Sequence, residues 1–152
     1  WTAEFGAPPR RTICVNAFAA NDPESSAEVL GLIGRRISLA EKSLLGVLSL
    51  REDRGDRTLQ WIDAARAGFF RDFEHVAVVG APARAAARKL RKALGPAIRI
   101  FSFVPNPNPR ELTDLIARAA VFEPVVIGLG NIVGPGERFV SCWKEAARRH
   151  GG

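Results

Sequence analysis

Five short apolar runs alternate with longer amphipathic segments, and this alternation constrains the fold more than any other feature of the chain. Each run is rich in Val, Ile, Leu or Phe and lacks strict polar alternation, as is typical of strands buried on both faces. The runs cover residues 12–18, 43–50, 75–79, 97–103 and 125–129. Strands that alternate with helices form a mostly parallel sheet covered by helices on both sides. We therefore expect a three-layer, Rossmann-like α/β fold with about five or six strands.

Helix start signals lie between the runs. Asp22 precedes Pro23 and Asn108 precedes Pro109, so each pair places a capping side chain before a proline at the first helical position. Glu111 stands at capping-box spacing from Asn108. Apolar residues at helical spacing predict two faces that pack on the sheet. These are Leu112, Leu115, Ile116 and Ala119 in one helix, and Phe139, Val140, Trp143 and Ala147 in the other.

The length of 152 residues suits one domain, which we expect to cover residues 1–152. The longest apolar run is far shorter than the ~20 residues that a membrane span needs. The first ten residues lack the pattern of a signal peptide. The chain begins with Trp1 and contains no methionine, so we expect it to be a piece of a larger protein.

Basic residues outnumber acidic ones by 22 to 16, a net charge of +6 that favours anionic partners. Nucleic-acid binding usually brings stacking aromatic residues or a known motif, and neither is present, so we expect no nucleic-acid partner. Cys14 and Cys142 form no Cys-x-x-Cys pair and no metal-ligand cluster. Two buried, reduced thiols would fit a cytoplasmic protein.

Three polar segments follow apolar runs, where an open parallel sheet binds its ligands. The first, residues 16–23, carries Asn16, Asn21 and Asp22 at a helix N-terminus, whose free N–H groups suit a carboxylate or phosphate. Asn21 and Asp22 could equally serve only as helix caps.

The second segment, residues 51–60, holds three arginines and three carboxylates. Arginine forks grip carboxylates and phosphates in bidentate geometry, and the interleaved aspartates could hold those forks in place. The alternative is a solvated charge run that neutralises itself. Its place at a strand end favours a binding role.

The third segment, residues 128–136, contains four glycines that permit close backbone approach. Its spacing and its place after the last strand differ from a dinucleotide fingerprint. The chain also has no G-x-x-x-x-G-K-[ST] loop for ATP phosphates and no nucleophile beside a base. This combination suggests the substrate side of a multidomain enzyme.

At these three segments the chain resembles the C-terminal domain of the poly-γ-glutamate synthase ligase subunit, a capsule-forming enzyme related to the Mur peptide ligases. The matching pieces are NAFAANDPES at residues 16–25, R-x-D-R-x-x-R-T-x-Q at 51–60, and G-x-G-N-I-x-G-x-G at 128–136. They occur in the family's order and span essentially the whole chain.

The resemblance implies an enzyme whose preceding domain binds ATP and Mg and activates a carboxylate as an acyl phosphate, which the amine of glutamate attacks. It implies no tight nucleotide binding and no activity for this piece alone. Other synthase subunits at the cytoplasmic face of the membrane are implied partners. Carried over by motif, the resemblance implies that Asn16, Asn21 and Asp22 face the nucleotide or the closing interface between domains. It implies that glutamate or the polyglutamate chain is bound by Arg51, Asp53, Arg54, Arg57, Gln60, Gly130 and Asn131.

Two other functions compete with this one. A non-catalytic module could bind a polyanion or a partner subunit through Arg84, Arg88, Arg91 and Lys92, although such a basic stripe is most often a solvated helix face. A stand-alone nucleotide-binding α/β protein is the third possibility.

Overall fold

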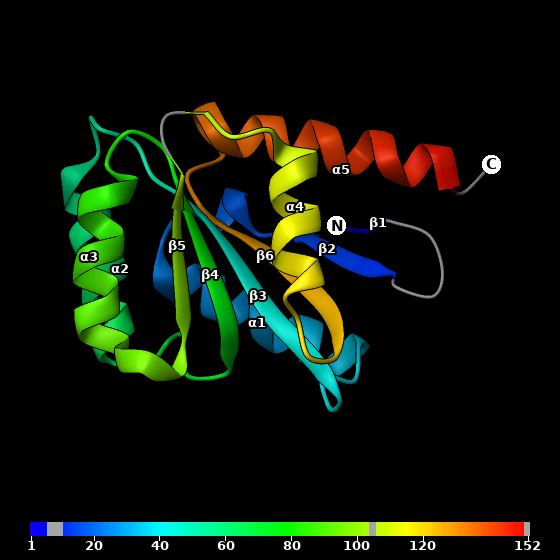
Figure 1. Ribbon diagram of the computed structural model, residues 1–152, viewed down its shortest axis with the longest axis horizontal. Helices are drawn as coiled ribbons and strands as arrows, with labels where there is room; N and C mark the ends of the chain where they lie inside the picture. Colours follow the sequence, from blue (N-terminus) through cyan, green and yellow to red (C-terminus); the bar gives the residue numbers. More distant parts are fainter. Residues whose placement is uncertain (6–10, 104–105, 151–152) are drawn as a thin grey trace.

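The computed structural model describes residues 1–5, 11–103 and 106–150. Within them the chain forms a six-stranded sheet of order β1-β2-β6-β3-β4-β5, in which β1 is antiparallel to β2 and the other pairs are parallel (Figure 1). The strands are β1 (Thr2–Phe5), β2 (Thr12–Asn16), β3 (Lys42–Ser49), β4 (Phe73–Val79), β5 (Arg99–Phe103) and β6 (Glu123–Gly130). The expected mostly parallel sheet is confirmed.

Helices cover both faces of the sheet. The α-helices are α1 (Pro23–Arg36), α2 (Gly55–Arg66), α3 (Ala83–Leu94), α4 (Pro109–Arg118) and α5 (Glu137–His150). Short turns η1 (Phe18–Ala20), η2 (Gly95–Ala97) and η3 (Ile132–Gly136) join them to the strands. One core cluster packs under α1, α2 and α3, and the other under α4 and α5, which gives the predicted three layers. None of the described helices is long and apolar enough to cross a membrane.

Every predicted strand differs from the observed one by one or two residues at one end or both, and one strand was not predicted; three of these differences have a clear physical reason. Strand β1 was missed, because four residues at a sheet edge carry too little apolar pattern to predict a strand. The first run ends as a strand at Asn16 rather than at Phe18, since the Asn16 side chain accepts a hydrogen bond from the Phe18 N–H and the chain turns into η1. Strand β5 begins at Arg99, because Pro96 lies in the turn η2.

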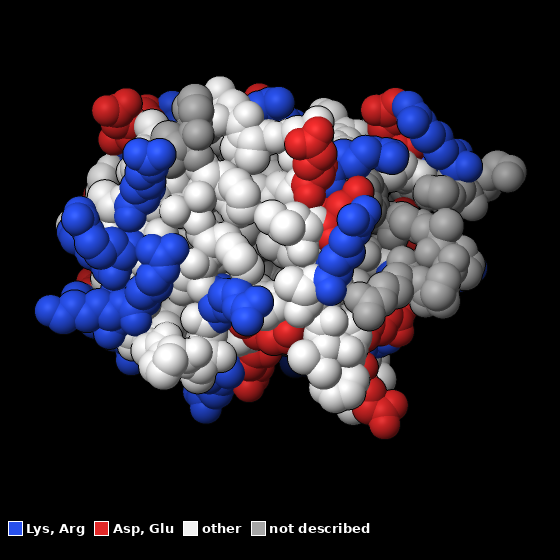
Figure 2. Space-filling model, viewed as in Figure 1, with Lys and Arg blue, Asp and Glu red and all other residues white. Residues whose placement is uncertain are grey.

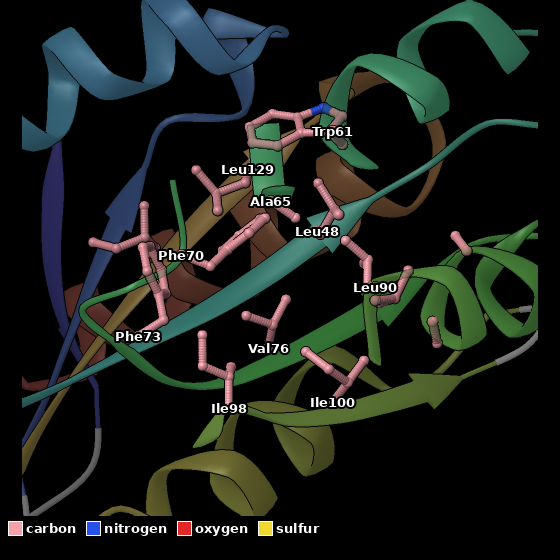
Figure 3. Packing of buried hydrophobic residues seen from close by; sticks show 14 of the residues in the cluster. Leu48, Trp61, Ala65, Phe70, Phe73, Val76, Leu90, Ile98, Ile100 and Leu129 are labelled. Atoms are coloured by element: carbon pink, nitrogen blue, oxygen red, sulfur yellow. The ribbon is translucent and has the colours of Figure 1, made fainter. Parts of the chain in front are cut away.

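The larger core cluster lies between the sheet and helices α1 to α3 (Figure 3). Alternate residues of β4 serve the two faces: Val76 and Val78 point into this cluster, whereas Ala77 and Val79 point into the other. This two-sided burial explains why the strands read as continuous apolar runs. Trp61 of α2 is fully buried against the rings of the 69–73 turn.

The second cluster joins α4 and α5 through a buried polar contact. The Trp143 indole N–H donates to Thr113 Oγ1 at 3.1 Å, and the Thr113 hydroxyl donates to the Pro109 carbonyl at 2.7 Å. The expectation that Leu115 faces the sheet is wrong, because its side chain is 49% exposed while Thr113 is buried. The tryptophan needs a hydrogen-bond partner on α4, and Thr113 supplies it.

Side chains of β3 and β4 fix the loop that enters β6 at the amino edge of the sheet, because they accept hydrogen bonds from the loop backbone. The Phe122 N–H donates to Ser43 Oγ at 2.9 Å, and the Ser43 hydroxyl donates to Glu74. The Val121 N–H donates to the same Glu74 carboxylate, with N–O distances of 3.2 and 3.3 Å. The buried hydroxyl of Ser43 thus has hydrogen-bond partners. The hydroxyl of Ser49, at the other end of β3, has none within the described residues.

Strand β6 runs directly over Phe18, and Gly128 makes this approach possible. A Cβ atom at residue 128 would lie 2.2 Å from a carbon of the Phe18 ring, which also packs against the rings of Phe139 and Trp143. We expect Gly128→Ala to lower the free energy of unfolding by about 1–3 kcal/mol through overpacking, as measured by urea denaturation.

The matched control is Gly31→Ala in α1, where an added Cβ meets no atom within 4 Å. That substitution is expected to raise the free energy of unfolding by about 0.5–1 kcal/mol, because alanine favours the helix. Equal effects of the two substitutions would contradict the account of Gly128.

Candidate functional site

The order of the strands places the three polar segments side by side. Strand β6 lies between β2 and β3, so the loops that follow these strands leave from adjacent positions on the carboxyl edge. Backbone hydrogen bonds continue this contact into the loops. The Ala17 N–H donates to the Gly128 carbonyl at 3.0 Å, and the Asn131 N–H donates to the Ser49 carbonyl at 2.9 Å. The three segments therefore form one surface.

In the first segment, two of the three predicted side chains have a local structural role. Asp22 caps α1: Oδ1 accepts from the Ser25 N–H at 2.9 Å, and Oδ2 accepts from the Ser25 hydroxyl at 3.0 Å. Asn16 Oδ1 accepts from the Phe18 N–H at 3.2 Å. Asn21 differs, since it has a left-handed backbone with φ of 59° and its Oδ1 has no hydrogen-bond partner within the described residues.

The cap shifts the ionisation of Asp22. The Ser25 N–H, helped by the Ser25 hydroxyl and the nearby Arg57 guanidinium, holds the pKa of Asp22 below its usual range. Arg57, in the second segment, thus acts on a carboxylate of the first.

In the second segment, the charges divide into a paired set and an available set. Arg51 donates to both carboxylate oxygens of Asp53, at 2.9 and 2.7 Å, and these bonds hold the pKa of Asp53 below its usual range. The self-neutralising interpretation is correct for this pair. Arg54, at the N-terminal end of α2, is exposed and makes no hydrogen bond or ion pair through its side chain in the described part of the chain.

Arg57 stands apart because it is half-buried. Its Nη1 donates to Gln60 Oε1 at 3.0 Å, while its Nε is buried without a partner among the residues that the structure describes. Gln60 is exposed on the outer face of α2 and orients the arginine. One guanidinium N–H of Arg57 is thus buried without a partner within the described residues, and a guanidinium N–H is a strong donor to anionic groups.

The third segment is held tightly against the end of β3. Gly130 has φ of 79°, and a Cβ atom there would lie 2.4 Å from the Ser49 carbonyl oxygen. The turn brings Asn131 to 6% exposure, with Nδ2 unpartnered in the described residues. Pro135, farther along the loop, helps line a hollow of about 260 Å³ together with Arg51 and Asp53.

Seven buried side-chain polar atoms lack a partner in the described residues, and four of them belong to the three polar segments or to the strand end before the second. These four are Asn21 Oδ1, Ser49 Oγ, Arg57 Nε and Asn131 Nδ2. Buried polar atoms in proteins normally have a hydrogen-bond partner, so this concentration makes the carboxyl edge the candidate ligand site. Ser49 Oγ, Arg57 Nε and Asn131 Nδ2 can donate to an anionic or phosphorylated ligand, whereas Asn21 Oδ1 can only accept.

Ser49 was missed by the sequence analysis. It is fully buried at the last position of β3, directly opposite Gly130 in the sheet. The available signal was a serine at the carboxyl end of an otherwise apolar run. Its position beside Asn131 follows only from the pairing of β3 with β6.

The cysteines lie away from this edge. Cys14 is fully buried in β2, and burial raises the pKa of its thiol well above the ordinary value. Cys142 in α5 is only half-buried, contrary to the expectation of two buried thiols, and burial raises its pKa less. Among the described residues, no group of His, Cys, Asp and Glu side chains could hold a metal ion.

Comparison with known proteins gives one family and one set of similar structures. The model of the poly-gamma-glutamate synthase CapB C-terminal domain matches residues 2–146. Crystal structure II of MurF from Acinetobacter baumannii aligns at a TM-score of 0.54 and 16% identity, covering 93% of this chain and 30% of MurF. Crystal structure I of the same protein aligns at 0.53 and 15%, covering 93% and 29%.

The chain therefore spans less than a third of the MurF chains that it matches. At this identity, the likeness concerns the fold. No curated protein sequence matches the chain.

The cap formed by Asp22 gives a pH-dependent prediction. We expect Asp22→Ala to lower the free energy of unfolding by about 1 kcal/mol at pH 7. Because the folded-state pKa is depressed, the carboxylate's contribution is present above the unfolded pKa of about 3.9 and is lost as pH falls through the folded pKa. Urea denaturation should show the difference between the two proteins narrowing below about pH 4. Asp22→Asn retains a capping oxygen, so it should lower the free energy of unfolding less than Asp22→Ala does. A difference between Asp22→Ala and the unaltered protein that does not change with pH would refute the role of the Asp22 carboxylate.

A second prediction concerns the unpartnered hydroxyl of Ser49. We expect Ser49→Ala to raise the free energy of unfolding by about 1 kcal/mol, because it removes a buried polar group that has no partner in the folded chain. Ser43→Ala, at the other end of the same strand, should instead lower it by about 1–3 kcal/mol, since it leaves the Phe122 N–H unpaired. Thermal and urea denaturation measure both. If Ser49→Ala destabilised the protein as much as Ser43→Ala, the Ser49 hydroxyl would have a structural role.

Proposed function

The chain belongs to the family of poly-gamma-glutamate synthase CapB C-terminal domains, and from this premise we propose that it is the substrate-side domain of an ATP-dependent amide ligase that synthesises poly-γ-glutamate. The ligase would form an amide bond between the amine of one glutamate and the side-chain carboxyl of another. ATP supplies the activation by converting the carboxylate to an acyl phosphate with release of ADP. The amine then attacks the acyl carbon, and phosphate and a proton are released as the amide forms.

The observation that carries the proposal is the group of unpartnered polar atoms on three adjacent strand ends. An incoming glutamate carries two carboxylates, and its amine has to be held beside the acyl carbon. Arg57 offers a free guanidinium N–H from a half-buried position, and Arg54 offers a complete fork nearby in sequence. These arginines are the proposed carboxylate ligands, since a guanidinium fork matches carboxylate geometry.

The two asparagines and Ser49 would complete the site. Asn21 Oδ1 is an acceptor that could orient an ammonium or hydroxyl group, and Asn131 Nδ2 is a donor for a carboxylate or phosphate oxygen. Ser49 Oγ can do either. The polar atoms therefore fit a ligand that has both donors and acceptors. An amino acid has both, and so does the nucleotide of the ligase. Asp22 and Asn16 would act through the shape of the loop, because their oxygens are already engaged.

The remaining parts of the proposed enzyme lie outside these residues. The sequence carries no P-loop motif, so another domain would bind the ATP phosphates and Mg. We propose that this domain precedes the present chain and that the carboxyl edge of the sheet closes over it. The association with other synthase subunits at a membrane is part of the same proposal.

The experiment measures glutamate-dependent ADP release by the full-length ligase. We expect Arg57→Ala to raise the KM for glutamate by roughly 10–100-fold, because a charge-assisted hydrogen bond contributes about 1.5–3 kcal/mol. Arg57→Lys should recover only part of the loss, since it keeps the charge without the fork. Ser49→Ala and Asn131→Ala should also reduce kcat/KM while the proteins remain folded.

The control is Arg35→Ala in the last turn of α1. Arg35 is exposed at the end of α1 that lies away from the carboxyl edge, so its removal takes away one positive charge without touching the candidate site. Kinetics near those of the unaltered enzyme are expected. If Arg57→Ala behaves like Arg35→Ala, the proposed carboxylate site is wrong.

A further inference from the structure

The outer face of α3 carries an uninterrupted set of positive charges. Its exposed basic residues are Arg84, Arg88, Lys89, Arg91 and Lys92, and the helix contains no acidic residue. The space-filling view shows Lys and Arg side chains gathered on the part of the surface that α3 occupies (Figure 2). We call these five residues the basic track.

The stability of the fold does not account for this charge pattern. Arg84 stands in the first turn of α3, where the helix dipole disfavours a cation. Arg84, Arg88 and Lys92 follow one another at i, i+4 spacing, so each repels the next. Within the described residues, these three side chains make no ion pair that would offset the repulsion. Arg91 is an exception, because its Nη2 donates to the Ile100 carbonyl at 2.8 Å and ties α3 to β5.

The basic track starts at the carboxyl edge of the sheet, beside the second polar segment. Gly80 and Ala81, which lead into α3, line the same 260 Å³ hollow as Arg51 and Asp53 of that segment. From there α3 runs away from the carboxyl edge for 12 residues, which is about 18 Å. A chain that leaves the site in this direction would pass along the track.

A groove between α2 and α3 accompanies the track. Its volume is about 510 Å³, and its lining combines apolar with cationic residues. The apolar ones are Leu59, Ile62 and Ala93, and the cationic ones are Arg66, Lys89 and Lys92. Leu59 is 54% exposed, so the groove offers an apolar surface next to positive charges.

We propose that the basic track and this groove bind the anionic polymer as it leaves the site, namely a γ-linked polyglutamate chain. This inference rests on the proposed function. Such a chain carries one carboxylate per residue on a backbone rich in methylene groups, so its charges match the cations and its methylenes match the apolar lining. The groove presents no aromatic side chain on which nucleic-acid bases could stack, which favours the polypeptide.

The test compares binding of γ-linked glutamyl oligomers to the chain and to two triple variants. The track variant is Arg84→Gln, Arg88→Gln and Lys92→Gln. The control is Arg35→Gln, Arg36→Gln and Arg148→Gln, which removes the same charge from exposed positions on α1 and α5. Fluorescence anisotropy at about 0.1 M salt keeps long-range attraction small. The probes are the glutamyl dimer and an oligomer of about twenty residues. Even an α-linked chain extends ~3.3 Å per residue, so the extended oligomer is longer than the ~18 Å of α3.

We expect the track variant to bind the long oligomer about tenfold more weakly, because three exposed ion pairs are lost. The control should change the affinity less than about twofold, and both variants should bind the dimer like the unaltered chain. Equal weakening in the two variants would overturn the proposal, as would tighter binding of single-stranded DNA of equal charge. The comparison needs no catalysis. Failure of the proposed function would appear instead as absence of glutamate-dependent ADP release in the unaltered full-length ligase.

Discussion

The pairing of β6 with β2 on one side and with β3 on the other is the interaction on which the rest of the structure depends. It requires two close approaches, of Gly128 to the Phe18 ring and of Gly130 to the Ser49 carbonyl. Both glycines lie in β6, the last strand along the chain. The pairing brings the ends of three strands together, although residues from 16 to 131 separate them in the sequence. Without it the polar segments would be three unrelated loops.

The polar residues at this edge fall into two kinds. Asp22 and the Arg51–Asp53 pair satisfy one another or the backbone, so they shape the loops. Asn21, Ser49 and Asn131 keep a buried polar atom unpaired in the described residues, which is a cost that folding alone does not repay. Such a cost is typical of sites whose chemistry conflicts with maximal stability. The same contrast separates Ser43, which is satisfied, from Ser49.

The basic side chains that give the chain its net charge of +6 also differ in their contacts. Some basic side chains support the fold, as Arg91 does by reaching the Ile100 carbonyl, and Arg66 pairs with Asp63 at the surface. The outer face of α3 instead accumulates like charges that weaken its own helix. This accumulation of like charges is the observation on which the proposed binding of a longer acidic chain along α3 rests.

The sequence by itself determined the class of fold and the places where its helices begin. Continuous apolar runs predict buried parallel strands, and Asp22 and Asn108 cap α1 and α4 as their spacing predicts, because both signals depend on contacts within a few residues. It also identified the segments at the strand ends, and the family resemblance that they carry is confirmed over residues 2–146.

Tertiary structure alone decided which of those residues are buried and which of their polar atoms have hydrogen-bond partners. The edge strand β1, the burial of Thr113 in place of Leu115, and the position of Ser49 beside Asn131 all depend on partners far away in the chain. The same holds for Arg57, which differs from Arg54 by being half-buried near Asp22. Local patterns cannot contain this information, because burial and hydrogen-bond satisfaction arise only when the strands are ordered in the sheet.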